Sequence, residues 1–530
     1  MKEFVWLISL SFCLFSSCTH SVMGSLPKAE EEQIERFIES KMEEFAVVPG
    51  LGVAIVRGSK IVYADGFGFR DVENQLPVTA ETGFYLASTS KSFLGMAAAQ
   101  LEQKGEVDLD ASLASHYPGW EMQAPIDAHA ISMVNLLSHN HDLRNSGLQF
   151  RLASVDEMSR EDMERVIFDF SRSRPQGFEY SNSSFNIAGA IMEKISDKSW
   201  KDIVNTEVFA PLGMVNTTAF ISKAVKRDFA YPYWQVGNEF ERLPLKDDRV
   251  MQSAGGHVST PIDLARWLIA NMNQGRIGKE QLIPAAAVRR VHQDYAELDS
   301  EFFEFKRPAY QLGWYRGDYE GDTLVHHFGS YQGYMAHTSY MPAHDLGVVV
   351  LANELDYGAI LPHLIAAYIY DFLLGKEGLE VKYDALTEGW KERYLQKKDR
   401  LEEQLHRKEQ LIKRLTEEPI DWLYDPNDLV GTYYSPRIGS FEIELRDGEL
   451  WTQYGVVSSK LLALQEGSFV GFWDFSGPKT PPVKLDIRYD QNNQVIGIDW
   501  EGRGFRRLAN GYTSAQVNQD FNALRAELKK

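Results

Sequence analysis

Residues 84–99 read FYLASTSKSFLGMAAA and contain the motif around which the rest of the chain can be ordered. Ser88 opens an apolar run of good helix formers, and Lys91 follows three residues later, which places both side chains on one face of the predicted helix. A serine hydroxyl becomes a nucleophile when a neighbouring base takes its proton, and a lysine can be that base if its pKa is lowered. An isolated Ser-x-x-Lys also fits a helix that starts with a serine cap, so later motifs decide its meaning.

The composition describes a large, acidic, globular protein. The chain has 530 residues, which predicts two or three domains, and its 44% hydrophobic and 12% aromatic residues suffice for large packed cores. The formal net charge is −20, and no basic block interrupts it. Because proteins bind nucleic acids by neutralising phosphates with Lys and Arg, this charge argues against a nucleic-acid partner.

The first eighteen residues predict a secretion signal rather than part of the fold. The apolar run from Phe4 to Phe15 is too short to cross a bilayer as a helix. Small residues then precede Cys18, which resembles the lipobox of bacterial lipoproteins, although Phe15 is untypical of that motif. We expect residues 1–18 to be a lipoprotein signal peptide, Cys18 to carry a lipid anchor, residues 19–28 to be a tether, and the chain to face the periplasm of a bacterial cell envelope. Plain secretion with cleavage near the same place is the alternative.

The segments on either side of the Ser88 helix predict the fold class. A helix ends near Phe45, and two β-rich runs at 51–56 and 61–64 form a hairpin. Later runs at 335–340 and 346–353 have the pattern of neighbouring antiparallel strands. Together they predict an α+β fold, in which an antiparallel sheet is flanked by helices.

A turn within residues 175–186 presents Tyr180-x-Asn182 just before a helix resumes. A tyrosine and an asparagine on one loop suit a Ser/Lys pair, the first as a proton carrier and the second as a group that orients an amide. Taken alone, the pair equally describes a core tyrosine above an Asx turn.

His139, His141 and Asp142 close a predicted helix and raise the question of a metal site. Zinc hydrolases space their ligands differently, and a histidine that closes a helix more often caps its carbonyl groups. Cys13 and Cys18 are the only cysteines, so the domains after the signal region hold no disulfide and no thiolate ligand. We therefore predict neither a metal nor a cofactor.

The motifs Ser88-x-x-Lys91, Tyr180-x-Asn182 and His327-x-Gly329 follow one another on a predicted helix, loop and strand. This order resembles the serine β-lactamase and penicillin-binding protein superfamily, in its class C-like branch with D-alanyl-D-alanine carboxypeptidases and esterases. The resemblance covers about residues 29–375. It is reinforced by four further signatures: LLSH at 136–139, PLGM at 211–214, AGG at 254–256 and YQLGW at 310–314.

The resemblance implies roles for individual residues. Ser88 would be the acylated nucleophile, Lys91 and Tyr180 would share the general-base work, and Asn182 would contact the substrate amide. The backbone N–H groups of Ser88 and Ser330 would form the oxyanion hole. The substrate would be an amide or ester of cell-wall or other origin: a peptide with a D-residue, a β-lactam or a small ester.

Two departures from the family pattern bear on the substrate. HFG at 327–329 stands where many β-lactamases have Lys-Thr-Gly, and HNHD at 139–142 stands where relatives often have His-Thr-Ser-Gly. The usual lysine helps to hold a substrate carboxylate, whereas a histidine with an ordinary pKa near 6.5 is largely uncharged at neutral pH. We expect neutral esters or amides to be processed better, with a preference that narrows as pH falls and His327 becomes charged, unless an arginine elsewhere binds the carboxylate. In the alternative, His327 only orients the loop.

Beyond the hydrolase region the sequence pattern changes twice. Residues 376–420 predict a connecting helix, whose apolar residues in the 390–418 stretch favour packing on the same chain or a homodimer. Residues 421–530 alternate in polarity and predict a small all-β domain, a sandwich or a barrel. This domain resembles the lipocalin-like domain often appended to this branch, and a terminal helix is predicted at 515–528.

The leading interpretation is a membrane-anchored serine hydrolase that acts through an acyl-enzyme on Ser88. The alternative is a catalytically idle wall-binding or scaffold lipoprotein that keeps the fold. The intact set of Ser, Lys, Tyr and Asn favours the enzyme.

Overall fold

The computed structural model describes residues 22–508 except for 237–238, 356–357, 418–424, 466, 474–479 and 501. Cys18, the rest of the expected signal peptide and the predicted terminal helix at 515–528 lie outside the described residues. Within the described part, no helix is both long and apolar enough to span a bilayer.

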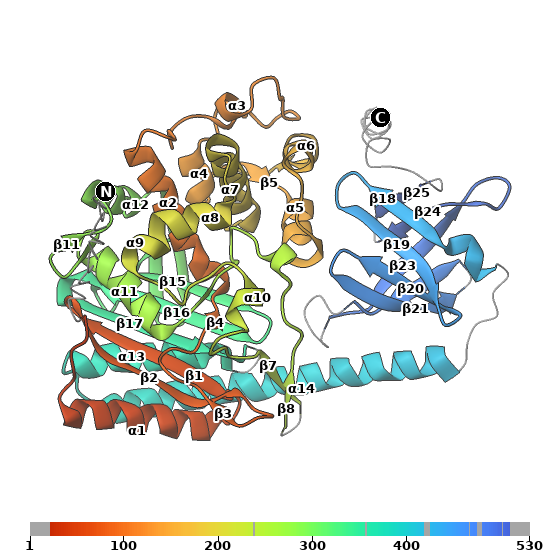
Figure 1. Ribbon diagram of the computed structural model, residues 1–530. Helices are drawn as coiled ribbons and strands as arrows, with labels where there is room; N and C mark the ends of the chain where they lie inside the picture. Colours follow the sequence, from red (N-terminus) through yellow and green to blue (C-terminus); the bar gives the residue numbers. More distant parts are fainter. Residues whose placement is uncertain are drawn as a thin grey trace, which may run out of the picture.

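A nine-stranded antiparallel sheet forms the centre of the hydrolase domain (Figure 1). The N-terminal hairpin pairs with the last strand of the domain, with Leu51 opposite Ala352, so the sheet is completed only when both ends of the domain meet. In spatial order the strands are β12 (Ala296–Phe302), β13 (Phe305–Tyr310), β14 (Tyr315–Tyr319), β15 (Asp322–Tyr331), β16 (Tyr334–Met341), β17 (Leu346–Ala352), β1 (Gly50–Arg57), β2 (Lys60–Asp71) and β3 (Leu76–Pro77).

Helices cover both faces of the middle of this sheet. β1 and β17 are buried along almost their whole length, which fits their runs of Val, Ile and Leu. Helix α11 (Pro261–Met272) covers one face. Helix α13 (Leu361–Leu373) covers the other face, and α1 (Lys28–Phe45) packs against α13. As its sequence predicts, α11 begins with a capping Thr260, whose side chain accepts a hydrogen bond from the N–H of Asp263.

The α11 side of the sheet carries a helical subdomain, and the hydrophobic core there includes residues of α2 and α7. Its helices are α2 (Lys91–Gln103), α3 (Leu113–His116), α4 (Met133–Leu137), α5 (Ser146–Phe150), α6 (Arg160–Phe170), α7 (Asn182–Ser196), α8 (Trp200–Val204), α9 (Ala210–Leu212), α10 (Ile221–Ala224) and α12 (Ala285–Val291). Short strands pair between them: β4 (Phe84–Tyr85) with β9 (Val258–Ser259), β5 (Leu143–Arg144) with β6 (Arg172–Ser173), β7 (Tyr233–Val236) with β8 (Glu239–Arg242), and β10 (Arg276–Ile277) with β11 (Glu280–Gln281).

One long helix, α14 (Leu379–Glu417), leads from the hydrolase domain to the C-terminal domain (Figure 1). Tyr383 and Leu401 are buried and join the core formed by α1, α13 and the sheet. Further along, Lys408 donates a hydrogen bond to the carbonyl of Thr480 in the C-terminal domain. Tyr383 and Leu401 thus pack on their own chain, whereas Val381 and Leu395 are exposed, and a homodimer through this helix stays a prediction.

The C-terminal domain is a closed eight-stranded antiparallel barrel. Its first and last strands pair, with Tyr433 opposite Arg507, and Phe441 and Ile443 alternate into the barrel core. The predicted α+β fold with a small all-β domain is confirmed, and the domain is a barrel rather than a sandwich. The strands are β18 (Gly431–Ser435), β19 (Gly439–Arg446), β20 (Glu449–Tyr454), β21 (Val457–Gln465), β22 (Ser468–Gly471), β23 (Val483–Tyr489), β24 (Val495–Trp500) and β25 (Arg503–Arg507).

Two local features are not anticipated by the sequence patterns. Residues 22–27, expected in a tether, lie along β2, where the Gly24 N–H donates to the Ile61 carbonyl. Residues 311–314, in the YQLGW signature, form a turn after β13, because Gly313 has a φ of +88° and passes close to the backbone of Lys91.

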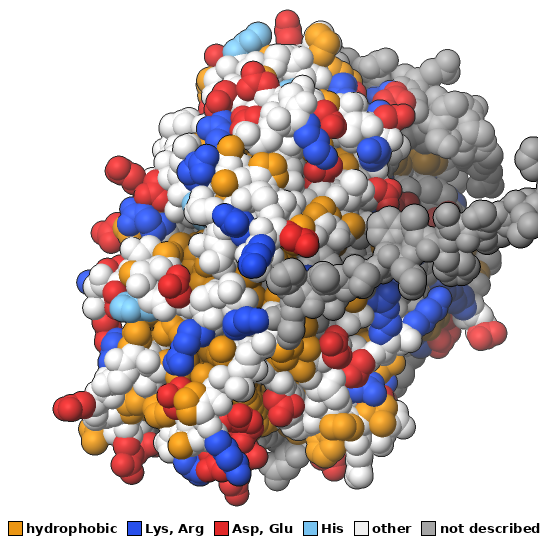
Figure 2. All heavy atoms as spheres, turned by 60° about the vertical axis from the view of Figure 1, so that its left-hand side comes forward, with side chains coloured by type: hydrophobic (Ala, Val, Ile, Leu, Met, Phe, Trp, Pro, Cys, Tyr) orange, Lys and Arg blue, Asp and Glu red, His pale blue; other side chains and the backbone are white. Residues whose placement is uncertain are grey.

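The charged side chains are dispersed over the face of the molecule in Figure 2, where acidic and basic groups alternate without a broad patch of one sign. The net charge of −20 is therefore not concentrated on that face.

Candidate active site

Ser88 lies in a short 3₁₀ turn, Ala87–Ser90, that runs directly into α2. Its side chain is partly exposed, whereas the helix that follows is buried among the apolar residues of the subdomain. The Nζ atom of Lys91, one turn further on, lies 3.1 Å from the Ser88 Oγ atom. The spacing of three residues therefore brings the hydroxyl and the amine into contact, as the motif predicts.

Lys91 is completely buried, and its surroundings favour the uncharged amine. Its Nζ atom lies 2.6 Å from Asn182 Oδ1 and 2.8 Å from the Ala254 carbonyl oxygen. No carboxylate pairs with it among the described residues, and burial lowers the pKa of the amine well below its usual 10.5. A neutral amine has two N–H donors and one lone pair, so it can donate to Asn182 and Ala254 while it accepts the Ser88 proton.

Tyr180 lies in the turn before α7, where its hydroxyl is close to the Ser88 side chain. The side chain as a whole is 37% exposed, but withdrawal of the hydroxyl from water raises the pKa of Tyr180, and the neighbouring Tyr315 raises it further. The ring also faces the Lys91 amine, which lies 4.8 Å from the ring centroid. At neutral pH Tyr180 is therefore a neutral phenol that still carries its proton, and of the two groups only Lys91 is suited to accept one.

His139 positions the turn that carries Tyr180, a role its sequence context did not reveal. Its Nδ1 atom accepts a hydrogen bond from the Ser181 N–H at 3.1 Å, and its ring lies 4.5 Å from the Tyr180 ring, centroid to centroid. Arg174 donates to the His139 carbonyl at 3.1 Å. The Nδ1 side of the imidazole thus holds the backbone of this turn, and its place in the LLSH signature was the available clue.

His327 is buried and held neutral. Its Nδ1 atom is 2.8 Å from the Phe328 carbonyl oxygen, so Nδ1 carries the proton and Nε2 accepts a hydrogen bond from the Tyr310 hydroxyl at 3.1 Å. Burial lowers the pKa of His327 well below 6.5, and the positive charge of Lys91 would lower it further. The expected gain of charge on His327 between pH 8.5 and 5.5 is therefore not supported, because the imidazole is out of contact with water.

Gly329 brings β15 against the Ser88 turn. A side chain at this position would collide with the Leu86 carbonyl oxygen and lie 3.0 Å from the Ser88 nitrogen. The Thr89 hydroxyl also donates to the His327 carbonyl at 3.3 Å, which fastens the turn to the strand. This close approach sets the Ser88 N–H beside the segment that ends in the exposed Ser330, as an oxyanion hole of two backbone donors requires.

One edge of β15 is open beside the nucleophile. β14 pairs with β15 only as far as Tyr315 opposite His326, and no other strand continues along that edge among the described residues. The backbone beyond His326 can therefore pair with an extended substrate, which is the way sheet edges bind peptides.

Arg307 is a second residue that the sequence did not single out. Its guanidinium lies 4.2 Å from the centroid of the Tyr315 ring and 4.7 Å from that of Phe302. Within the described part of the chain it has no ion pair or hydrogen bond, and its charge influences the pKa of Tyr180 and His327. A cation held on aromatic rings next to the site is suited to an anionic group on a substrate.

Metal-ligating side chains gather at one place in the described residues, away from these motifs. Oxygen atoms of Glu102, Asp108 and Asp110 lie within 4.8 Å of one another. Glu102 and Asp110 already form ion pairs with Arg290. This acidic group therefore has a structural role at the far end of α2.

Comparison with known proteins gives the family. A family profile described as "Beta-lactamase" matches residues 34–367, which is more than half of the chain. The chain belongs to this family. The matched range contains the Ser88, Tyr180 and His327 motifs, whereas the barrel lies outside it.

Individual relatives are distant. Protein flp of Staphylococcus aureus (strain N315) is 24% identical over 336 residues, which cover 62% of this chain and 64% of that protein. The beta-lactamase of Escherichia coli (strain K12) is 24% identical over 362 residues, which cover 62% of this chain and 90% of the relative. The chain thus spans less than two thirds of the length of the staphylococcal relative.

A solved structure shows the same fold. The octameric penicillin-binding protein homologue from Pyrococcus abyssi superposes with a TM-score of 0.57 at 22% identity, over 90% of this chain and 99% of that one. The shared fold extends over nearly the whole of both chains. The recognition of the β-lactamase and penicillin-binding protein superfamily is confirmed.

Proposed function

We propose that this β-lactamase-family protein is a serine hydrolase that cleaves an amide or ester through an acyl-enzyme on Ser88. The observation that carries the proposal is the buried Lys91 amine, 3.1 Å from the Ser88 Oγ atom and without a carboxylate partner in the described residues. A lysine so placed is a base that is ready at neutral pH.

The proposed reaction has two halves. Lys91 takes the Ser88 proton while Oγ attacks the substrate carbonyl, and the backbone N–H groups of Ser88 and Ser330 bind the developing oxyanion. As the carbonyl re-forms, the Tyr180 hydroxyl gives its proton to the leaving amine or alkoxide and regains one from Lys91. Water then attacks the acyl-enzyme with the same groups in reverse order and frees Ser88.

The substrate class that the site suits best is an extended peptide or ester. The free edge of β15 supports a chain that lies along the strand, with its carbonyl above Ser88. The neutral His327, in place of a lysine, supports slow turnover of β-lactams relative to esters and D-residue peptides.

The test is hydrolysis by the purified chain of a D-Ala-D-Ala peptide, nitrocefin and nitrophenyl esters. We expect turnover of at least one acyl donor, lost in Ser88→Ala and in Lys91→Arg. The arginine is also a long basic side chain, but it stays protonated and cannot act as a base, because its pKa is above 12. Hydrolysis that survives both substitutions would refute the proposal, and specific binding without turnover would favour the idle scaffold.

We also propose that Cys18 carries a lipid that anchors the chain in a bacterial cell envelope. The support is the apolar run followed by small residues and Cys18. Stable anchoring needs more than one acyl chain, which bacterial lipoproteins have. Cys18→Ala should release the protein from the membrane fraction or stall its processing, and unchanged processing with full membrane retention would contradict the anchor.

A further inference from the structure

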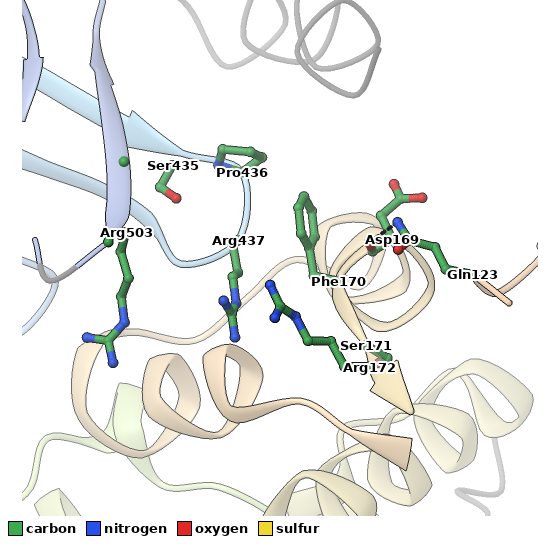
Figure 3. A pocket seen from close by; sticks show the side chains of 11 residues that line it. Gln123, Asp169, Phe170, Ser171, Arg172, Ser435, Pro436, Arg437 and Arg503 are labelled. Atoms are coloured by element: carbon green, nitrogen blue, oxygen red, sulfur yellow. Dashed lines mark hydrogen bonds between the residues drawn. The ribbon is translucent and has the colours of Figure 1, made fainter. Parts of the chain in front are cut away.

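Three arginines face a cleft between the helical subdomain and the barrel. Arg172 comes from β6, Arg437 from the turn between β18 and β19, and Arg503 from β25. The cleft has a volume of about 260 Å³ and is also lined by Phe170 and Pro436. Figure 3 shows Arg172 and Arg437 pointing toward each other across the gap, with Arg503 on the barrel side of Arg437.

These guanidinium groups lack counter-charges. None of the three forms an ion pair with the described residues, although the protein carries a net charge of −20. Asp169 lines the same cleft, but in Figure 3 it lies on the other side of Phe170 from the arginines. Like charges that share a cleft repel one another, so an anion between them would stabilise the arrangement.

Arg437 is held in place rather than free to turn away. Its Nη2 atom donates to the Ser146 hydroxyl at 3.2 Å, and its side chain runs so close to Gly147 that a Cβ there would lie 3.1 Å from the Arg437 Cγ atom. Its Nε atom is buried without a hydrogen-bond partner in the described part of the chain. The positive charges of Arg172 and Arg503, together with burial, lower the pKa of Arg437. An orphaned buried donor on a fixed side chain calls for an explanation, and an anion bound between the three arginines would supply one.

We propose that this interdomain cleft is a binding site for a phosphate group, either a phosphate monoester or a pyrophosphate, that Arg172, Arg437 and Arg503 clasp between the two domains. The paired N–H donors of a guanidinium match two oxygens of a phosphate. A doubly charged phosphate also neutralises more of the charge on three arginines than a singly charged carboxylate does. Phe170 and Pro436 offer an apolar wall to whatever carries the phosphate. The site does not involve Ser88, so it is independent of the proposed hydrolase reaction.

Calorimetry on the full-length chain tests the site with pyrophosphate as the probe. We expect saturable binding that Arg172→Gln and Arg437→Gln each weaken at least tenfold. The matched control is Arg276→Gln, which removes the same charge from the β10–β11 hairpin, outside the cleft, and should bind as wild type does. The Arg172 side chain makes no hydrogen bond among the described residues, so its replacement should leave the melting temperature of the unbound protein unchanged. Pyrophosphate should raise that temperature only in wild type and the control.

A second arm distinguishes the source of the phosphate. Vesicles that contain phosphatidic acid present the monoester as a lipid headgroup. Arginine-dependent binding to these vesicles, competed by pyrophosphate, assigns the site to a lipid, whereas binding of pyrophosphate without arginine-dependent vesicle binding assigns it to a soluble ligand. Absence of saturable pyrophosphate binding, or equal binding by all four proteins, would overturn the proposal.

Discussion

At the residue scale, the proposed chemistry depends on Lys91, which is buried and has no acidic partner among the described residues. Lys91 would be an ordinary surface cation with a pKa near 10.4 if it were exposed. Burial and the two acceptors Asn182 Oδ1 and Ala254 O instead suit a neutral amine whose lone pair faces Ser88. The Ser88-x-x-Lys91 motif therefore depends for its chemistry on Asn182 and Ala254, which lie far along the chain.

Arg307 leads to a prediction about substrate charge. If its ring-bound guanidinium binds a substrate carboxylate, Arg307→Gln should lower kcat/KM for an acid substrate about 10- to 100-fold, the value of one charge-assisted hydrogen bond, and leave the matched methyl ester within about threefold. The control is Arg316→Gln, which removes an arginine that pairs with Asp294 in the loop before β12. The measurement is kcat/KM for both substrates between pH 5.5 and 8.5, where His327 should add no titration. Equal losses on acid and ester would remove Arg307 from carboxylate recognition.

At this scale, a sequence predicts contacts between residues that are close together in the chain but not between residues that are far apart in it. Ser88 and Lys91 share a helical turn, so their contact follows from spacing alone. The Ala254 carbonyl and Arg307 have no such local relation to them, because backbone acceptors and lone arginines carry no recognisable motif. The ordinary pKa of a histidine in water was expected for His327, because a sequence does not show how deeply a strand residue is buried.

At the scale of elements, the contact between β15 and the Ser88 turn depends on glycine. We predict that Gly329→Ala separates the strand from the turn, slows acylation on the order of 10²- to 10³-fold through the oxyanion hole, and lowers stability by about 1–3 kcal/mol. Gly389→Ala is the control, since a Cβ there meets nothing within 4 Å in α14, and it should stabilise the chain by about 0.5–1 kcal/mol. Acylation rates and melting temperatures of the two variants and of wild type check these expectations. Wild-type acylation by Gly329→Ala would show that the close approach is unimportant.

Most elements follow from periodicity, and the exceptions have physical reasons. The central strands and α11 were predictable because burial and capping leave clear local patterns. Residues 22–27 pair with β2 through backbone groups, which every sequence has. No side-chain pattern therefore predicts this pairing. The connecting helix predicted at 376–420 corresponds to α14, and Tyr383 anchors its first turns in a core that the sequence alone does not locate.

At the scale of the whole molecule, buried neutral histidines make the protein sensitive to acid. Burial lowers the pKa of His257 and His337 to about 3 and that of His292 to about 4. Histidines in the unfolded chain bind protons below about pH 6.5, so each such residue lowers the free energy of unfolding by about 1.4 kcal/mol per pH unit between that value and its folded pKa. Asp263, whose pKa burial raises to about 6, acts in the opposite direction, but the histidines outnumber it. Others buried in the same way are His139, His141, His326, His327 and His363.

We therefore predict that the melting temperature falls steeply between pH 6.5 and 4.5. His326→Phe should flatten this fall, because both ring nitrogens of His326 are buried without partners in the described residues and its ring already stacks on Phe328. Differential scanning calorimetry from pH 8 to 4.5 compares the two proteins. A flat wild-type profile would contradict the buried neutral histidines.

The two domains are joined by specific contacts as well as by α14. The Val456 N–H donates to the Val155 carbonyl at 2.8 Å, and the Phe150 and Trp500 rings lie 5.6 Å apart, centroid to centroid. Val155 belongs to the barrel core although it lies within the hydrolase part of the chain. Sequence patterns predicted both domains but not the contact between them, because the contacting residues come from distant segments that carry no shared motif.

The most direct test of the central claim is the mass of the chain after reaction with a fluorophosphonate or a fluorescent penicillin. The account predicts a single adduct on the peptide that contains Ser88, formed slowly in Lys91→Arg and absent in Ser88→Ala, with the melting temperature of Ser88→Ala close to that of wild type. Equal labelling of wild type and Ser88→Ala, or an adduct on another residue, would contradict it.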